Sequence, residues 1–304
     1  YFCNSSIAPL RSLDITLKFF PILKDGNPDL SACEKLLNEG NPDLIVAVHY
    51  FGKPALVKEL SDFSTMNKAW LIEDGAHVLQ RVDGVGNYGD FILYSPHKFL
   101  PIPEGGLLIL RDSGPGKITK TILEQFDFNS IHSSIINDGA PFKKLTLKWL
   151  AKRLLQRAGV RGKPSEVAFQ GDEAVMDVGE SPHPRMSQLS KNLLQLKLPN
   201  LEKESRIRKA NQEQWDFRLS NTEINKAAFF PLTGSYTPYL AAFLCENSQM
   251  AENTFVSLQD KKIPVSTWPD LPPEVLLERK KHSVAIELRQ TRFFLPVHSS
   301  LSLD

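Results

Sequence analysis

Short apolar runs alternate with amphipathic stretches along the first third of the chain. The apolar runs occupy residues 17–23, 43–52, 69–74, 91–95 and 105–111. The run 43–52 is continuous rather than alternating, which is typical of a strand that is buried on both faces. The runs 69–74, 91–95 and 105–111 are expected to be further buried strands, and residues 17–23 are also expected to form a strand. The stretches 29–40 and 54–67 have the apolar spacing of helices. Strand and helix in this order predict an α/β fold with a mainly parallel sheet, helices on both faces and right-handed crossovers.

Local signals place the ends of the two predicted helices. Asp29 or Ser31 would cap the first helix, and Gly40 would end it. Pro54 stands at the start of the second, where its missing N–H group costs nothing.

The pattern changes after residue 116. Residues 143–159 form a basic amphipathic stretch, which we expect to be a helix packed on the body with solvated Lys and Arg side chains, rather than a membrane or calmodulin-type segment. Residues 162–184 read as a long loop, and helices are predicted over 185–197 and 200–220. We therefore expect three parts: a large α/β domain over 1–140, a connecting loop and helices over 141–220, and a small α+β domain over 221–304.

Composition limits the classes of partner. The 304 residues carry 36 basic and 35 acidic side chains, so a nucleic-acid partner has no electrostatic support. No apolar run approaches the ~18 residues that cross a bilayer, and no secretory signal opens the chain, so we expect no membrane association. Three scattered cysteines favour a reducing compartment, and we expect a cytoplasmic protein. The first methionine is Met66, which suggests a truncated or processed form.

Chemically active side chains gather where two predicted strands end. Asp74 follows the run 69–74, and Ser95, His97 and Lys98 follow the run 91–95. Ligands of open parallel sheets bind outside the carboxyl ends of the strands. These side chains are therefore expected to meet at one edge of the sheet.

This set of residue types matches the needs of pyridoxal phosphate. A lysine of lowered pKa forms an imine with an aldehyde. A carboxylate keeps the proton on the pyridine nitrogen, and hydroxyl and N–H donors at a strand–helix junction bind phosphate. Asp74, His77, Ser95 and Lys98 supply these parts in chain order.

The motifs resemble a known family. The segment 71–110, with its "EDGAH", "GNYGD", "SPHK" and "EGG" motifs, resembles the DegT/StrS family of pyridoxal-phosphate-dependent sugar aminotransferases of fold type I. "VHYFGKP" at 48–54, "RMS" at 185–187 and "FFLPVH" at 293–298 are similar to further parts of that family. The resemblance covers almost the whole chain.

The resemblance implies roles for four residues. Lys98 would hold the cofactor as an imine and move protons, Asp74 would pair with the pyridine nitrogen, His77 would lie by the ring and its hydroxyl, and Ser95 would bind the phosphate. It also implies an aspartate-aminotransferase-like large domain and a homodimer. The reaction it implies is transfer of an amino group from an amino acid, glutamate by family resemblance, to a nucleotide-linked keto sugar in polysaccharide biosynthesis.

The chain departs from the family pattern in three places. Only two residues separate Ser95 from Lys98, a spacing also found in the cysteine desulfurase branch of the fold. His183-Pro184-Arg185 stands where the family often has Asn-Tyr-Arg, whose Asn reaches the partner subunit's phosphate. The family's N-terminal portion, with a small-residue phosphate loop and an aromatic that stacks on the ring, has no recognised counterpart, so we expect cofactor binding to be weak or absent.

Simpler interpretations stay open. A non-catalytic or truncated homologue is one alternative, and a desulfurase or lyase is another, although none of the three cysteines lies in a Gly- or Ser-rich loop after Lys98. Asp74 could cap a turn, and His77 could be a core histidine. His49 and Asp90 are expected to be structural, Cys245 to be buried and inert, and His97 to orient its loop.

Overall fold

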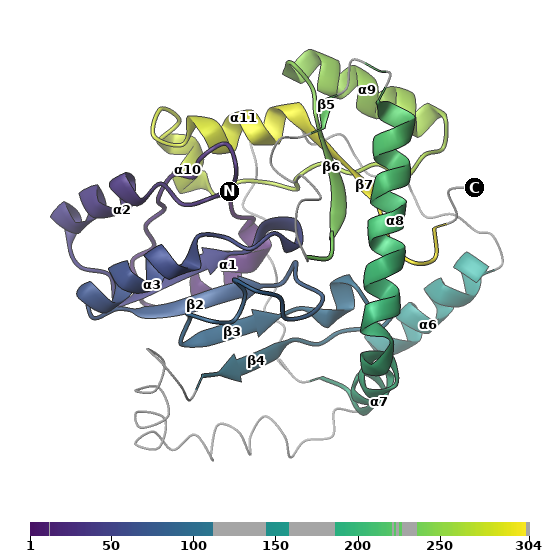
Figure 1. The fold of residues 1–304 in the computed structure, drawn as a ribbon, viewed down its shortest axis with the longest axis horizontal. Helices are drawn as coiled ribbons and strands as arrows, with labels where there is room; N and C mark the ends of the chain where they lie inside the picture. The colour runs from purple at the N-terminus through teal and green to yellow at the C-terminus, as the bar shows by residue number, and fades with distance from the viewer. Residues whose placement is uncertain are drawn as a thin grey trace.

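The computed structural model describes residues 1–11, 13–111, 144–157, 186–220, 222, 225–226 and 236–301. Two sheets organise these residues (Figure 1). The first sheet has the strand order β1-β2-β3-β4, and the second has the order β5-β6-β7. The long helix α8 (Leu201–Leu219) runs beside both sheets.

The first sheet confirms the α/β prediction. β1 (Leu44–Val48), β2 (Trp70–Gly75) and β3 (Phe91–Tyr94) are parallel neighbours, and β4 (Leu107–Leu110) pairs antiparallel with β3. Asp74 lies opposite Val48 on one side and Leu93 on the other. The carboxyl ends of the three parallel strands therefore reach the same edge of the sheet.

Two expectations about strands are wrong. β1 and β2 alternate between buried and more exposed positions, and three of the four β4 residues are exposed, so these strands are not covered on both faces. Residues 17–23 form no strand, because only Ile22 makes an isolated bridge, to Pro28. Apolar content reports attraction to a core but does not supply a pairing partner, which a strand also needs.

The helices around the first sheet follow their sequence signals closely. α2 (Leu30–Leu36) begins after Asp29, whose carboxylate accepts the N–H of Ala32, and a 3₁₀ turn, η1 (Leu37–Glu39), carries it to Gly40. α3 (Val57–Met66) starts three residues after Pro54 and packs on β1 and β2. One apolar cluster fills this layer, formed by Cys33, Ile45, Ala47, Val57, Leu60, Phe63 and Leu71.

The second half supplies the other sheet and its cover. α7 (Gln188–Lys197), the 3₁₀ turn η5 (Leu198–Asn200) and α8 lead to β5 (Asn225–Lys226) and β6 (Leu240–Leu244). α9 (Ser248–Asp260), α10 (Pro273–Leu277) and α11 (Ser283–Thr291) precede β7 (Arg292–Pro296), which pairs antiparallel with β6. The helices predicted over 185–197 and 200–220 are confirmed in the described residues. The loop predicted over 162–184 lies outside the described residues, and the division into three parts stays a prediction.

An aromatic cluster joins the chain's first residues to the second sheet. α1 (Asn4–Arg11) is anchored by the buried N–H of Asn4, which donates to Asp270 at 2.7 Å, and by Arg11, which pairs with Glu274. Tyr1 stacks on Trp268 with ring centroids 4.3 Å apart, and Phe51 stacks on Phe294 at 4.7 Å. These contacts connect segments that are more than 200 residues apart in the sequence.

The basic amphipathic helix differs from its prediction. α6 (Lys144–Arg157) forms, but Leu147, Leu154 and Leu155 are more than half exposed. Among the described residues of the helix, these three leucines are therefore not buried, whereas Trp149 and Leu150 are half-buried. No helix in the described part of the chain is long and apolar enough to cross a membrane.

Candidate active site

The predicted residues leave the sheet at its carboxyl edge. Asp74 occupies the penultimate position of β2, and the backbone N–H of His49 donates to its carbonyl, which continues the β1–β2 ladder beyond β1. After β3, Ser95 leads into the short 3₁₀ helix η3 (Pro96–Lys98), which brings Lys98 back toward β2. Neighbouring parallel strands thus supply one carboxylate and one amine.

A small cavity of about 30 Å³ lies between these groups. Lys98, Asp74 and His77 line it together, as the sequence predicted. Ser95 does not line it. The remaining lining comes from the end of β1, the chain start and the second sheet's side of the molecule, namely Tyr1, Phe2, Cys3, Ser6, Val48, Tyr50, Ala76 and Trp268.

Burial shapes the charges of Lys98 and Asp74 in opposite senses. Burial lowers the pKa of Lys98, against the nearby Asp74 carboxylate, which favours the charged amine. Burial raises the pKa of Asp74, although the Ala76 N–H at 2.8 Å and the Lys98 charge pull it back. Each group is thus costly to ionise alone and is stabilised by the other.

His77 is held neutral between aromatic rings. Its Nδ1 accepts the N–H of Phe51 at 3.3 Å, so the ring hydrogen resides on Nε2. It stacks on Tyr239 with a centroid distance of 4.5 Å and an interplanar angle of 15°, and it approaches Phe51 at 5.4 Å. Burial first, and then the Lys98 charge, lower the pKa of His77 well below its ordinary value.

Ser95 and His97 form a separate contact on the outer side of η3. Nδ1 of His97 lies 3.1 Å from the carbonyl oxygen of Gly105 and 3.2 Å from Oγ of Ser95. Because a carbonyl can only accept, Nδ1 carries the hydrogen. His97 therefore ties the turn before Lys98 to the turn before β4, as its predicted orienting role requires.

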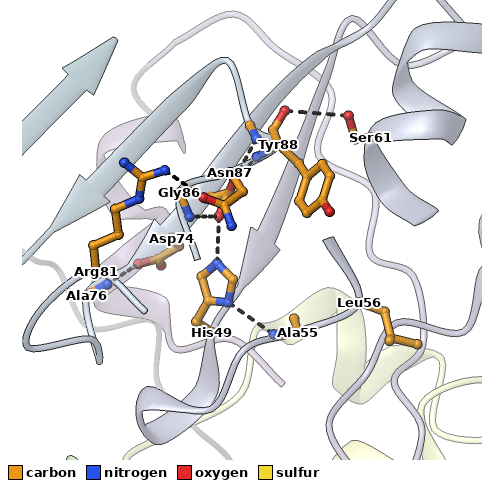
Figure 2. A network of polar contacts seen from close by, with 12 residues as sticks. His49, Ala55, Leu56, Ser61, Asp74, Ala76, Arg81, Gly86, Asn87 and Tyr88 are labelled. Atoms are coloured by element: carbon orange, nitrogen blue, oxygen red, sulfur yellow. Dashed lines mark hydrogen bonds and ion pairs between the residues drawn. The ribbon is translucent and has the colours of Figure 1, made fainter. Parts of the chain in front are cut away.

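Glu73, the neighbour of Asp74, belongs to a buried network (Figure 2). Its carboxylate accepts from His49 Nε2 at 3.0 Å and from the backbone N–H groups of Gly86, Tyr88 and Gly89. The Ala55 N–H donates to His49 Nδ1, which fixes the hydrogen on Nε2. Burial would raise the pKa of Glu73, but these hydrogen bonds hold it below its ordinary value.

The sequence analysis predicted a structural role for His49 but did not identify Glu73 as its hydrogen-bond partner. Glu73 and His49 are both fully buried. The sequence did carry a signal for this partner, because Glu73 is an acidic residue at an inward-facing position of an apolar strand. A carboxylate that is buried there needs several hydrogen-bond donors nearby. The Gly-rich turn at 84–89 supplies three of them.

The first residues of the chain also reach the site, which the sequence did not reveal. Tyr1 and Phe2 line the cavity, so aromatic side chains are present where none had been recognised. Cys3 lines it too, with Sγ 3.0 Å from Oγ of Ser6, whereas Cys33 and Cys245 are buried elsewhere. His183 and Arg185 lie outside the described residues.

The donor set fits pyridoxal phosphate, but the space is tight. A lysine, a half-buried carboxylate and a neutral histidine converge, and the buried Nε1 of Trp268 has no hydrogen-bond partner among the described residues. A cavity of this size admits about one water molecule. A second cavity of about 720 Å³, between residues 14–20, α2 and β1, shares Tyr1, Phe2, Val48 and Tyr50 with it. The two cavities therefore adjoin at these shared residues.

Comparison with known proteins identifies the family. The family model described as "DegT/DnrJ/EryC1/StrS aminotransferase family" matches residues 18–301. The chain therefore belongs to this family. This is a family of aminotransferases, and the match confirms the family resemblance on which the site was predicted.

Solved structures agree with the fold. One similar structure is the putative sugar aminotransferase Spr1654 from Streptococcus pneumoniae in its PMP form, with a TM-score of 0.68 at 17% identity. The match covers 99% of this chain and 76% of the Spr1654 chain. An aminotransferase of the family from Brucella abortus has a TM-score of 0.65 at 15% identity, with 99% and 74% covered. Helicobacter pylori PseC, involved in pseudoaminic acid biosynthesis, scores 0.62 at 20% identity, with 97% and 71% covered.

Curated relatives match over a shorter span. A serine hydroxymethyltransferase from Pyrobaculum calidifontis is 30% identical over 138 residues, which are 41% of this chain and 32% of that protein. The enzyme of the same name from Thermococcus kodakarensis is 36% identical over 95 residues, 29% of this chain and 22% of that protein. The matched portion thus spans a third or less of these curated relatives.

Proposed function

We propose that this member of the DegT/DnrJ/EryC1/StrS family moves an amino group from an amino acid, with glutamate the favoured donor, to a nucleotide-linked keto sugar. The observation that carries the proposal is the convergence of Lys98 and Asp74 from neighbouring strand ends onto one cavity. Bound pyridoxal phosphate would supply an electron sink for cleaving a bond at the substrate's amine-bearing carbon.

The residues divide the work as follows. Lys98 would attach the cofactor and, once released, carry a proton on Nζ, a task suited to an amine whose pKa is lowered by burial. The Asp74 carboxylate would hold a proton on the ring nitrogen, and neutral His77 would lie beside the ring. Ser95, which faces away from the present cavity toward His97, is proposed as a phosphate ligand through its hydroxyl.

Several further properties belong to the same proposal. A cytoplasmic location accords with three cysteines that form no disulfide in this structure. A homodimer and a role in polysaccharide biosynthesis come with the family resemblance. PseC, a fold neighbour, is named for the biosynthesis of pseudoaminic acid, and this supports a sugar as the acceptor.

Spectroscopy of the bound cofactor tests the proposal. The chain is mixed with pyridoxal phosphate, and the visible absorbance band is followed for wild type, Lys98→Ala and the exposed-lysine control Lys280→Ala. We expect a band in wild type and Lys280→Ala, none in Lys98→Ala, and bleaching on addition of glutamate. A band without bleaching by any amino acid would support a binding-only homologue, and a band that persists in Lys98→Ala would refute the site.

A second candidate rests on the curated relatives. Their identity to this chain, 30% and 36% over the matched stretches, favours chemistry on serine itself, such as hydroxymethyl transfer. A spectral change with serine but not with glutamate, and no amino sugar formed from a keto sugar, would select this candidate.

The desulfurase alternative is supported only by the position of Cys3 at the cavity. If the protein released sulfur from cysteine, Cys3→Ala would abolish that release.

A further inference from the structure

Arg208, in the middle of α8, is among the most deeply buried side chains of the described residues, with 2% of its surface exposed. Burying a guanidinium group is expensive unless each face and edge of it finds a partner. α8 is otherwise a strongly polar helix, so nothing in its own pattern calls for a buried arginine.

The partners of Arg208 come from three separate segments. Nε donates to Oε1 of Glu204, one turn earlier, at 2.9 Å. One terminal nitrogen donates to the carbonyl of Phe99 at 3.1 Å, and the other donates to the carbonyl of Tyr239 at 3.3 Å. The guanidinium carbon also lies 4.8 Å from the centroid of the Phe99 ring.

Both carbonyls belong to residues that build the site. Phe99 directly follows Lys98, and Tyr239 directly precedes β6 and stacks on His77. The Lys98 Nζ lies 5.9 Å from the centroid of the Tyr239 ring, and the Phe99 and Tyr239 rings are 5.2 Å apart. The Arg208 side chain thus links the loop that carries the Lys98 amine to the segment that carries the Tyr239 ring.

We propose that Arg208 is a positioning residue, which holds Lys98 over Tyr239 and beside Asp74 by fastening the Phe99 and Tyr239 carbonyls to a single rigid fork. This deepens the proposed function and rests on it for the meaning of Lys98. α8 makes a second tie one turn away, where Oγ of Ser205 lies 2.6 Å from Oγ1 of Thr237. The helix therefore sets the spacing between the two sheets at the point where the site forms.

Arginine suits this position better than lysine. Its planar fork reaches several acceptors at fixed angles, whereas an ammonium group is a single point on a flexible stem. Arg208→Lys keeps the charge opposite Glu204 but cannot reach both carbonyls at once. The turn from Pro96 to Leu100 would then be free to move, and water would reach Lys98.

The test measures Lys98 directly in the cofactor-free chain. Reductive methylation with formaldehyde is run across a pH series, and mass spectrometry gives the pH of half-modification for Lys98 and for exposed Lys280. The titratable groups that face Lys98 or share its cavity come from several elements: Asp74 from β2, His77 from the following turn, Tyr239 from before β6, Tyr50 from after β1, and Tyr1 and Cys3 from the chain start. None of these is changed by the substitutions.

We expect the Lys98 midpoint to lie below that of Lys280 in wild type and to move up toward it in Arg208→Lys. The matched control Arg206→Lys, at an exposed position of the same helix, should leave it unchanged. A Lys98 midpoint that is the same in wild type and Arg208→Lys would overturn the proposal.

A double variant separates positioning from general stability. Glu204→Gln with Arg208→Met removes the buried pair as a whole, and such replacements are often neutral for stability. If this variant folds as stably as wild type and its Lys98 midpoint still rises, Arg208 acts on the site; if the midpoint returns to the wild-type value, the role is structural only and the proposal fails. Because no cofactor is used, failure of cofactor binding in the earlier experiment leaves this result intact.

Discussion

Glu73 and Asp74 are adjacent carboxylates of β2, and their surroundings shift their pKa values in opposite directions. Glu73 is fully buried, accepts four hydrogen bonds and has a lowered pKa. Asp74 accepts a single backbone hydrogen bond from Ala76, faces Lys98 and has a raised pKa. The pleat of the strand turns consecutive side chains to opposite faces, so one position of difference separates the two environments.

The contrast shows how this edge of the sheet distributes its polar groups. The network around Glu73 is satisfied within the protein, and it fixes the Gly-rich turn 84–89 and the end of β1 (Figure 2). Asp74 keeps hydrogen-bonding capacity that the described residues do not fill. A carboxylate with unused capacity beside a lysine is suited to bind a ligand, whereas a saturated one is suited to hold structure.

Glu73→Ala should be the most damaging single change to stability. It strands the three N–H donors of Gly86, Tyr88 and Gly89 and leaves His49 without its acceptor, so we expect a loss of about 3–5 kcal/mol in the free energy of unfolding. Urea denaturation measures this loss. Glu59→Ala, at an exposed position of α3, is the matched control and should change stability by less than about 0.5 kcal/mol. An equal loss of unfolding free energy in the two variants would contradict the structural role of Glu73.

Asp74→Asn should have the opposite pattern of effects, with little change in stability and a large loss of activity. Unfolding should be nearly unchanged, because a neutral amide still accepts the Ala76 N–H and no longer carries a costly buried charge. The transamination rate should fall by about a hundredfold or more, since an amide cannot hold a proton on the ring nitrogen. Single-turnover bleaching with glutamate measures the rate. Wild-type rates in this variant would show that Asp74 is only a turn residue.

Much of the fold follows from the sequence, because local signals agree with tertiary packing. The cap at Asp29, the end near Gly40 and the strands around Ile45, Leu71 and Ile92 lie where their patterns put them. Residues 17–23 failed as a strand although they are apolar, since pairing is a property of two segments and sequence periodicity describes one. β4 does pair with β3, but its exposure was missed because apolar content does not say which elements cover the faces of a strand.

The site was predictable only where strand order determines it. Asp74 and Lys98 come together because consecutive parallel strands end at one edge, which is a topological rule. Tyr1, Trp268 and Arg208 reach the site from sequence positions far from it, and no local pattern encodes such contacts. Glu73 could have been found from its buried position alone.

Gly52→Ala tests how tightly the backbone is packed beside His77 and Thr237. A Cβ there would lie 2.2 Å from the carbonyl oxygen of Thr237 and 3.2 Å from that of His77, at a φ of +95°. We expect a loss of about 2 kcal/mol from strain and overlap. Gly40→Ala shares the positive φ but meets nothing within 4 Å, so it should lose about 1 kcal/mol. Thermal unfolding compares the two, and equal losses would show that the contact with Thr237 yields freely.

The pH dependence of stability gives the finest comparison of the two carboxylates. Because the pKa of Glu73 is lowered in the folded state, its stabilising contribution is complete above the ordinary glutamate value and is lost as the pH falls through the lowered one. The pKa of Asp74 is raised, so its buried charge costs stability above that raised value, and the cost is relieved as the pH falls through it. Wild type should therefore exceed Glu73→Gln most at neutral pH, with the gap closing in acid.

Relative to Asp74→Asn, wild type should instead be at its weakest at neutral pH and should gain as the pH falls through the raised pKa. Urea midpoints of the three proteins between about pH 7 and pH 3.5 measure both differences across the range where carboxylates titrate. Because the variants share one strand and neutral amide replacements, differences in charge elsewhere cancel. Two curves of the same sign would mean that the neighbouring carboxylates occupy equivalent environments, and the division between a structural and a ligand-binding acid would then be lost.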